Sequence, residues 1–176
     1  MRILGVDSSG MVASVALVED DLLVAEYSVN YKKTHSQTLL PMLDEIVKMT
    51  ELDLNTIDAI AVAAGPGSFT GLRIGAATVK GLGLALEKPV VSVPTCHGLA
   101  YNLWGSDKLI CPIMDARRSQ VYTGIYEFAK DGMQVLLDQS AMDIRALAEK
   151  LNAMGREVIF LGDGCPVYAS VLAECM

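Results

Sequence analysis

A glycine-rich stretch between two apolar runs contains the residue types that could do chemistry in this sequence. GPGSFTGLRIG, residues 65–75, combines four glycines with two hydroxyl side chains and an arginine. Loops of this composition hold phosphates in many nucleotide-binding enzymes, because glycine exposes backbone N–H groups and a helix N-terminus favours negative charge. The stretch therefore raises the question of whether the protein is a nucleotide enzyme.

The same stretch departs from the patterns that such chemistry requires. It lacks the Gly-Lys-Ser/Thr ending of a Walker loop, and Arg73 falls inside the following helix. A peptidase would use Ser68 as its nucleophile, but Pro66 breaks the Gly-x-Ser-x-Gly spacing and no His–Asp pair stands beside it. A tight strand-to-helix turn, with Thr70 as the helix N-cap, explains these residues more simply. The expected structural residues of the turn are Gly65, Gly67, Ser68, Thr70 and Gly71.

The remaining candidate ligands do not have the spacing of a metal site. The four cysteines contain no Cys-x-x-Cys pair. His35 and His97 belong to different expected elements, and neither has an acidic partner at ligand spacing. We expect no bound metal, and reduced thiols in a cytosolic protein.

The composition indicates a packed globular chain. Of 176 residues, 52% are hydrophobic and 20% are charged, and the net charge is −7 at pH 7. An acidic chain is not expected to hold nucleic acid alone, because phosphate binding needs clustered Lys and Arg. The sequence offers no run of membrane-spanning length, and Asp7 comes too early for a signal peptide. The mean hydropathy of +0.37 leaves open a large core or apolar surface kept for a partner.

The elements that position the glycine-rich stretch follow from hydrophobic periodicity and turn residues. The sequence predicts, in chain order, strands at 3–7, 13–19 and 21–29, a helix at 34–50, a strand at 58–65, a helix at 71–86, a strand at 88–93 and a short helix at 95–104. The stretch thus joins a buried strand to a long helix.

The second part of the chain repeats the order of the first. Residues 109–128 again contain an apolar strand that ends in an aspartate, a polar turn and a second strand, with Asp115 in the place of Asp7. A helix at 143–155 then precedes an apolar strand that runs into Gly-x-Gly. The repeat predicts two lobes on one plan, 1–104 and 105–176. Because little sequence follows the second Gly-x-Gly, we expect the second lobe to be truncated at its C-terminus.

Four segments together resemble the TsaB (YeaZ) family: ILGVDSS, HSQTLLPMLDEI, GPGSFTGLRIGAATVKGLGLAL and MDARRSQVY. The resemblance covers residues 1 to about 165. It implies a two-lobed α/β fold of the actin-like ATPase superfamily, which is built on ribonuclease H-like lobes. It also implies a non-catalytic, cytoplasmic subunit in the synthesis of threonylcarbamoyladenosine (t6A) at position 37 of tRNA.

The resemblance further implies the partners of the chain. These are a TsaD-type catalytic subunit, which carries the metal and performs the transfer, and a TsaE-type ATPase. The chain is expected to form a homodimer when alone and to meet tRNA only through the complex. The two metal-binding histidines of the catalytic paralogue match positions near Thr95 and Leu99, neither of which is a ligand.

In this superfamily a nucleotide binds on the two hairpin turns. The first turn is compatible with a phosphate, but in the second turn Arg117 and Arg118 do not leave the backbone open as glycine does. We therefore expect weak or vestigial ATP binding at most. An active ATPase or kinase of the same fold remains the alternative, with a peptidase third. The expected vestigial residues are Asp7, Ser8, Ser9, Gly10 and Asp115.

The helix at 71–86 is apolar almost all round, and only Arg73 and Lys80 are charged. Such a helix must be buried on most sides, so that the side opposite its own sheet needs another neighbour. Its glycines each cost up to about 1 kcal/mol of helix stability relative to alanine, which makes sense where backbones approach closely.

We expect this helix and the helix at 34–50 to contact the TsaD-type subunit or a second copy of the chain. The alternative is that both helices are core, covered by other parts of the chain. The expected interface residues are Leu39, Met42, Leu43, Ile46, Leu72, Arg73, Ala76, Val79 and Lys80.

Overall fold

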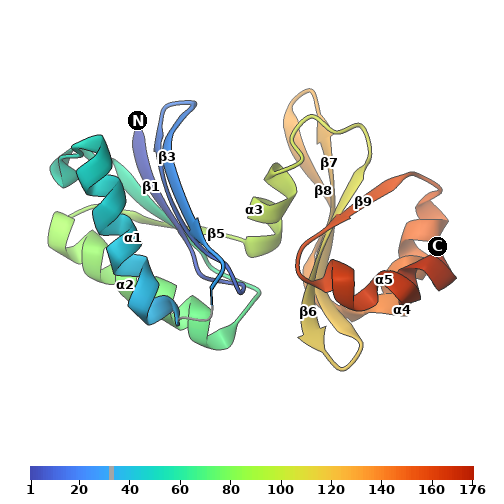
Figure 1. Cartoon of the computed structure of the whole chain (residues 1–176). Coiled ribbons are helices and arrows are strands. Elements are labelled where there is room, and N and C mark those ends of the chain that lie inside the picture. Colours follow the sequence, from blue (N-terminus) through green and yellow to red (C-terminus); the bar gives the residue numbers. More distant parts are fainter. Residues whose placement is uncertain (32–33) are drawn as a thin grey trace. The chain divides into compact units, whose positions relative to one another are not determined.

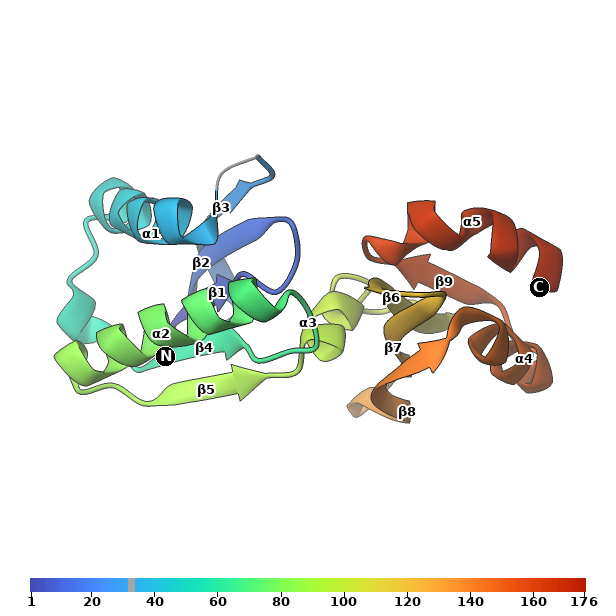
Figure 2. The same cartoon turned by 90° about the horizontal axis from the view of Figure 1, so that it is seen from below.

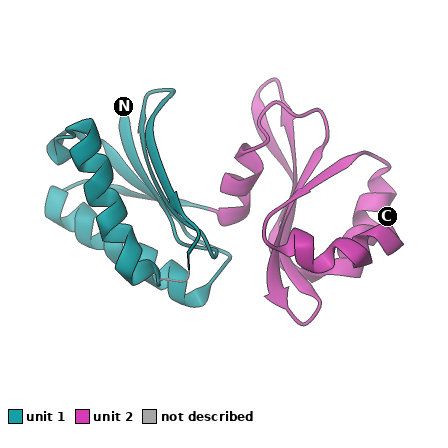
Figure 3. Cartoon of the chain, in the orientation of Figure 1, with its two compact units in different colours: residues 1–93 teal, residues 94–176 magenta. Residues whose placement is uncertain are grey.

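The computed structural model describes residues 1–31 and 34–176, which form two compact units, Met1–Val93 and Pro94–Met176 (Figure 3). The expected boundary at 104/105 lies too late in the chain. Helix α3 (Thr95–Tyr101) belongs to the second unit, because its Cys96 and Ala100 pack against Ile110 and Tyr126 of that unit.

The first unit is a five-stranded mixed sheet with two long helices on one face (Figures 1 and 2). The strand order is β3-β2-β1-β4-β5, with β1, β2 and β3 antiparallel and with β4 and β5 parallel to β1. Its elements are β1 (Arg2–Asp7), β2 (Ala13–Glu19), β3 (Leu22–Val29), α1 (His35–Thr50), the 3-10 turn η1 (Leu54–Thr56), β4 (Ala59–Ala63), α2 (Phe69–Leu86) and β5 (Val90–Val93).

The core of the first unit lies between the sheet and the two helices. Alternate residues of each strand face the helices, as Leu4 and Val6 of β1 do, because side chains of a strand point to opposite faces in turn. Helix α1 contributes large apolar side chains to this core. Helix α2 instead buries Gly71, Gly75, Val79 and Gly83, which are spaced four apart, so that mostly bare backbone faces inward.

The second unit repeats the topology of the first, which confirms the duplication predicted from the sequence. Its sheet order, β8-β7-β6-β9, matches β3-β2-β1-β4. The core packs α4 and α5 on one side of the sheet, and α3 packs around Ile110 and Tyr126. The sequence-based reading missed β8 and α5. The elements after α3 are β6 (Leu109–Arg117), β7 (Gln120–Ala129), β8 (Gly132–Asp143), α4 (Ile144–Met154), β9 (Val158–Leu161) and α5 (Gly164–Cys175).

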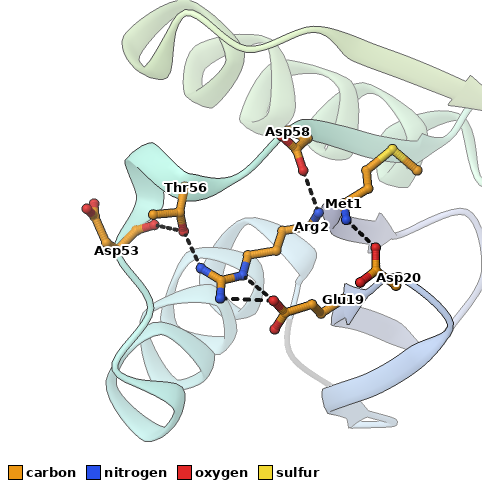
Figure 4. Close-up of polar contacts among 7 residues, drawn as sticks. All are labelled: Met1, Arg2, Glu19, Asp20, Asp53, Thr56 and Asp58. Atoms are coloured by element: carbon orange, nitrogen blue, oxygen red, sulfur yellow. Dashed lines mark hydrogen bonds and ion pairs between the residues drawn. The ribbon is translucent and has the colours of Figure 1, made fainter.

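A polar network holds the start of β1 in the first unit (Figure 4). The Arg2 guanidinium contacts the Glu19 carboxylate through Nε at 3.1 Å and donates to Thr56 Oγ1 at 2.9 Å. The Arg2 N–H donates to Asp58 Oδ2 at 2.6 Å, and the N-terminal amine pairs with Asp20. The network therefore ties the start of β1 to β2, to η1 and to Asp58, the residue before β4.

Candidate functional site

The first hairpin turn, between β1 and β2, is covered by the N-terminal end of α2. The Ser8 hydroxyl donates to the Gly71 carbonyl oxygen at 2.8 Å, and the Ser68 N–H donates to the Ser9 carbonyl oxygen at 2.6 Å. The Ser9 N–H in turn donates to Asp7 Oδ1 at 2.7 Å. Ser8 and Ser9 are buried, so two of the expected phosphate-binding residues are engaged within the unit.

Three glycines of α2 and its preceding loop make this cover possible. A Cβ atom on Gly67 would lie 2.3 Å from the Ser9 carbonyl oxygen, and one on Gly71 would lie 2.0 Å from the Ser8 carbonyl oxygen. At Gly75 the clash would be with Ser8 Oγ, at 2.4 Å. The glycines of the glycine-rich stretch thus serve the close packing of α2 on the turn.

Ser68, and not Thr70, is the N-cap of α2. The helix begins at Phe69, and Ser68 Oγ accepts the Gly71 N–H at 3.2 Å. Thr70 lies in the first helical turn, where its side chain is exposed. The structure does show a tight strand-to-helix turn at this place, with Gly65 at a φ of 107°.

The hydrogen bonds around Ser68 do not form a hydrolytic arrangement. Its Oγ serves the helix cap, and the nearby His35 lies with Nε2 2.9 Å from the Gly10 carbonyl oxygen. A serine nucleophile would need a histidine within hydrogen-bond reach of its Oγ atom. Within residues 1–31 and 34–176, no three His, Cys, Asp or Glu side chains are grouped so that they could hold a metal ion.

The second turn, between β6 and β7, is held by a side chain of α5. The Tyr168 hydroxyl donates to Asp115 Oδ1 at 2.9 Å and lies 3.2 Å from the Gln120 carbonyl oxygen. Asp115 Oδ1 also accepts the Arg117 N–H at 2.9 Å. These two hydrogen bonds, with that of Arg117 first, hold the pKa of Asp115 below its usual value, because both stabilise the carboxylate.

The backbone of the second turn differs from that of a glycine phosphate loop. Arg117, Arg118 and Ser119 adopt φ values of 69°, 54° and 60°, a left-handed region that non-glycine residues seldom occupy. The Asp115 N–H donates to Asp163 Oδ1 at 3.2 Å, so that a second carboxylate borders the turn. The arrangement offers an anion two exposed arginine side chains but no open backbone cradle.

The structure corrects the expected interface at five positions. Leu39, Met42, Leu43, Ile46 and Val79 are at most 5% exposed and pack between the helices and the sheet. They belong to the core of the first unit, which is the alternative that the sequence left open. Their side chains are therefore not available to a partner.

The remaining expected interface residues lie on or beside the outer face of α2. Arg73 and Lys80 are exposed, while Leu72 and Ala76 are half-buried on the side of the helix nearer β5. These four residues stay candidates for a contact.

The outer face of α2 also carries apolar residues that the expected interface omitted. Phe69, Arg73, Ala77, Lys80 and Leu84 follow one another at spacings of three or four, and all five are exposed. We call these residues the α2 stripe. Phe69 is 74% exposed and Leu84 is 84% exposed, although both are large apolar side chains. The spacing itself is the sequence signal that predicts such a stripe.

Helix α1, which lies next to α2, also exposes an apolar side chain. It contacts α2 along the same face of the sheet (Figure 2). Leu40 of α1 is 57% exposed. The two adjacent helices therefore present apolar side chains outward as well as inward.

Residues 23–174 match the family model described as TsaD, tRNA N6-adenosine threonylcarbamoyltransferase. The chain is 36% identical to the tRNA threonylcarbamoyladenosine biosynthesis protein TsaB of Bacillus subtilis, over 100% of this chain and 77% of that protein. It is also 36% identical to the Escherichia coli protein of the same name, over 93% of this chain and 72% of that one.

A solved structure agrees with these relatives. A protein with similarity to the peptidase YeaZ from Pseudomonas aeruginosa superposes with a TM-score of 0.83 and 29% identity, over 96% of this chain and 78% of that chain. The repeated strand order of the two units, together with this neighbour, confirms the expected duplicated α/β fold. The chain belongs to the TsaB (YeaZ) family, among the sequences that the TsaD family model describes.

Proposed function

We propose that the chain is a non-catalytic subunit that binds and organises a TsaD-type catalytic subunit in t6A modification of tRNA. The chain belongs to a family of t6A biosynthesis proteins, which gives the pathway. The observation that carries the organising role is the exposed α2 stripe, with the exposed Leu40 on the adjacent helix α1. Large apolar side chains gathered on one exposed helix face, with polar residues between them, often mark an interaction site.

The form of this surface fits helix-to-helix docking. Ala77 of the stripe and the exposed Gly81, one turn further along α2, are small, so that the backbone of a partner helix can approach α2 closely between Phe69 and Leu84. Burying one leucine or phenylalanine side chain stabilises a contact by roughly 1.5–3 kcal/mol. Two or three such side chains can therefore anchor a complex.

The two hairpin turns support the non-catalytic part of the proposal. Ser8 and Ser9 are buried under α2, and Asp115 is bonded to Tyr168. Nucleotide binding by the isolated chain would have to displace these contacts, so we expect at most weak ATP binding and no ATP hydrolysis. We further propose a cytoplasmic protein that works with a TsaE-type ATPase, reaches tRNA only within the complex, and self-associates through the same helices when alone. No helix in the described ranges is both long and apolar enough to cross a bilayer.

The test is reconstitution of t6A synthesis from the purified TsaC, TsaD and TsaE proteins of the same organism, with and without this chain. Modified nucleoside is measured by mass spectrometry of digested tRNA. We expect t6A only when the chain is present. Equal t6A in its absence would contradict the proposed role.

A variant pair assigns the role to the stripe. The double substitution Ala77→Arg and Leu84→Arg should remove complex formation with the catalytic subunit and t6A synthesis together, because it places two charges where apolar side chains dock. Both positions are exposed, so the first unit should stay folded. The matched control is Val167→Arg on α5, also an exposed apolar residue of a long helix, which should leave both measurements unchanged.

A further inference from the structure

Strand β3 forms an edge of the first sheet. One of its sides pairs with β2, and no other described strand lies along its second side. Backbone N–H and C=O groups on such a side can pair with a strand from another chain, and proteins usually shield them by shortening or distorting the edge. In β3 six of the eight residues are exposed, among them the large side chains of Leu22, Leu23, Val24 and Tyr27.

The other edge strands of the two sheets have this kind of protection. Strands β5 and β9 contain only four residues each. The pairing of β8 with β7 shifts its register at two places. The pairing of β3 with β2 shifts once, and residues 25–29 then pair without interruption. These residues form the longest uninterrupted stretch of sheet edge in the described chain.

A groove of about 430 Å³ lies between this stretch of β3 and helix α1. Residues two apart on a strand point to the same side, and Tyr27 and Val29 both line the groove. Tyr31 continues the alternation beyond the end of the strand and lines it too. Pro41 and Met42 of α1 belong to the facing wall. A strand added to β3 can therefore place a side chain in this groove.

The lining of the groove favours a cationic side chain with an apolar stem. The rings of Tyr27 and Tyr31 border the groove, and both are exposed. Glu45 of α1 is the charged residue among the described lining residues, and it is exposed as well. Aromatic faces and a carboxylate attract a guanidinium or an ammonium group, while the methylene stem of arginine or lysine packs on apolar surface. A carboxylate side chain would instead be repelled by Glu45.

The opposite face of this stretch is polar. The Ser28 hydroxyl donates to Glu26 Oε1 at 2.8 Å and also contacts the Ser14 hydroxyl of β2. Because the side chains of a strand alternate, an added strand would place polar side chains over this face and its cation on the side of α1. The edge therefore matches an extended segment in which polar residues alternate with a central arginine or lysine.

We propose that β3 pairs with an extended segment of another protein, and that this segment places an arginine or lysine in the groove beside α1. The backbone of the edge supplies the pairing, and Tyr27, Tyr31 and Glu45 select the side chain. The contact goes beyond the proposed function, because it involves neither the α2 stripe nor the catalytic subunit. Its failure would leave that function intact.

The experiment titrates the isotope-labelled full chain with a capped synthetic peptide, Thr-Val-Thr-Arg-Thr-Val-Thr. Alternation places the valines and the arginine on one side and the threonines on the other. A glutamate or a leucine in place of the arginine tests the groove. Proline in place of the two threonines beside the arginine removes backbone donors that the pairing needs. Amide chemical shifts locate the site, and the titration gives the dissociation constant.

Two variants of the chain address the groove. Glu45→Gln removes its charge, and Tyr27→Thr removes one ring but keeps a residue that strands favour. The matched control is Glu149→Gln, at an exposed carboxylate of helix α4 in the second unit. The double substitution Ala77→Arg and Leu84→Arg is a second control, because it changes the α2 stripe alone.

We expect the arginine peptide to shift the amides of residues 25–29 and to bind at least about fivefold more tightly than the glutamate peptide. Glu45→Gln and Tyr27→Thr should each weaken its binding roughly two- to fivefold, with both controls unchanged. The proline peptide should not bind. Equal binding of the arginine, leucine and glutamate peptides would overturn the proposal, and so would shifts confined to other residues or the absence of any saturable shift.

A second copy of the chain is the competing occupant of the edge. In that case the amides of residues 25–29 would broaden with increasing protein concentration in the absence of peptide. The broadening would persist in the variant with Ala77→Arg and Leu84→Arg, which separates it from association through the α2 stripe. Two β3 edges would then pair with each other, and the proposal of a foreign segment would be wrong.

Discussion

The two hairpin turns occupy equivalent places in the two units, yet different groups hold them. In the first unit, backbone covers the turn: Gly71 lies so close to Ser8 that no Cβ atom fits between them. In the second unit, a side chain does so: Tyr168 of α5 reaches down to Asp115. The two units therefore share one topology, but close packing holds the turn of the first unit and a hydrogen bond holds the turn of the second.

The difference shows that two units with the same strand order can hold the equivalent turn by contacts of unlike strength. Close packing cannot be reversed without a large backbone movement, whereas a single hydrogen bond contributes roughly 1 kcal/mol. The first unit should therefore depend on its turn for stability much more than the second does.

The largest expected effect is on the reactivity of the thiols. All four cysteines lie in the second unit, so their reactivity reports on the opening of that unit alone. Burial raises the pKa of the Cys96 and Cys111 thiols to about 12. At pH 8 their thiolate fraction should then be roughly a thousandfold below that of an ordinary cysteine, and the rate of reaction should fall with it. We expect a disulfide reagent to label these two only on unfolding, as followed by mass spectrometry.

Cys175 is the internal control for that measurement, since it is half-buried at the end of α5. It should react in the folded protein. Rapid labelling of Cys96 at pH 8 would show that the second unit opens readily. The second unit, and not the first, would then be the one whose stability is easily lost.

The next effect concerns the covered turn of the first unit. Gly71→Ala places a Cβ atom 2.0 Å from the Ser8 carbonyl oxygen, so that α2 or the turn must move. We expect a loss of about 3 kcal/mol or more in the free energy of unfolding, measured by urea titration with far-ultraviolet circular dichroism. The thiols of the second unit should stay protected in the same variant.

Gly81 provides the matched control on the same helix. A Cβ atom at Gly81 meets nothing within 4 Å. Gly81→Ala should therefore stabilise the first unit by roughly 0.5–1 kcal/mol, since alanine is the better helix former. If both substitutions had equal effects, helix propensity alone would account for Gly71, and close packing on the turn would not.

The sequence was sufficient to predict the duplicated fold but not the use of its helix faces. Local signals were enough to predict the topology. They are the alternating strands, the Gly-x-Gly turns and the two aspartates Asp7 and Asp115. Burial is set by tertiary contacts. The spacing of Leu39 and Val79 is compatible with either face of a packed helix, and only the contact with the sheet shows that they belong to the core.

Other features were missed because their cause lies far away in the chain. Tyr168 contacts Asp115 across 53 residues, and no local pattern marks that pair. The sequence predicted Thr70 as the N-cap, whereas the structure has Ser68 there. The Ser68 N–H also donates to the Ser9 carbonyl oxygen, a contact between residues far apart in the chain. Strand β8 lacks regular alternation, since its register with β7 shifts in two places.

A smaller effect tests the bond that holds the second turn. Tyr168→Phe removes the donor to Asp115 and should cost about 1 kcal/mol at pH 7, read from urea unfolding by the fluorescence of Trp104, the only tryptophan. Tyr122→Phe is the control, because no hydrogen bond of the Tyr122 hydroxyl occurs within the described residues. It should leave stability unchanged.

The same variant changes how stability depends on pH. The pKa of Asp115 is lowered in the folded state, first by the Arg117 N–H and then by Tyr168, so its contribution is present above the unfolded pKa of about 3.9. That contribution is lost as pH falls through the folded pKa. On acidification from pH 5, the free energy of unfolding of the Tyr168→Phe variant should therefore fall less than that of the wild type. The expected difference is about 1 kcal/mol. Parallel curves would show that Tyr168 does not act through Asp115.

The smallest effect compares the starts of the first strands, where each unit places a basic residue beside an acidic one. Arg2 makes two-atom contact with Glu19 and also reaches Thr56, whereas Lys108 makes a single contact of 3.1 Å with the largely exposed Glu157. Arg2→Met should cost about 1 kcal/mol and Lys108→Met about 0.3 kcal/mol in low salt, because exposed single pairs contribute little and the planar guanidinium loses more bonds. Urea unfolding in 0.5 M salt should reduce both costs by screening. Salt should not weaken the hydrogen bond from Arg2 to the neutral Thr56, so Arg2→Met should remain the costlier change. Equal costs in high salt would mean that the network of Figure 4 stabilises β1 by charge alone.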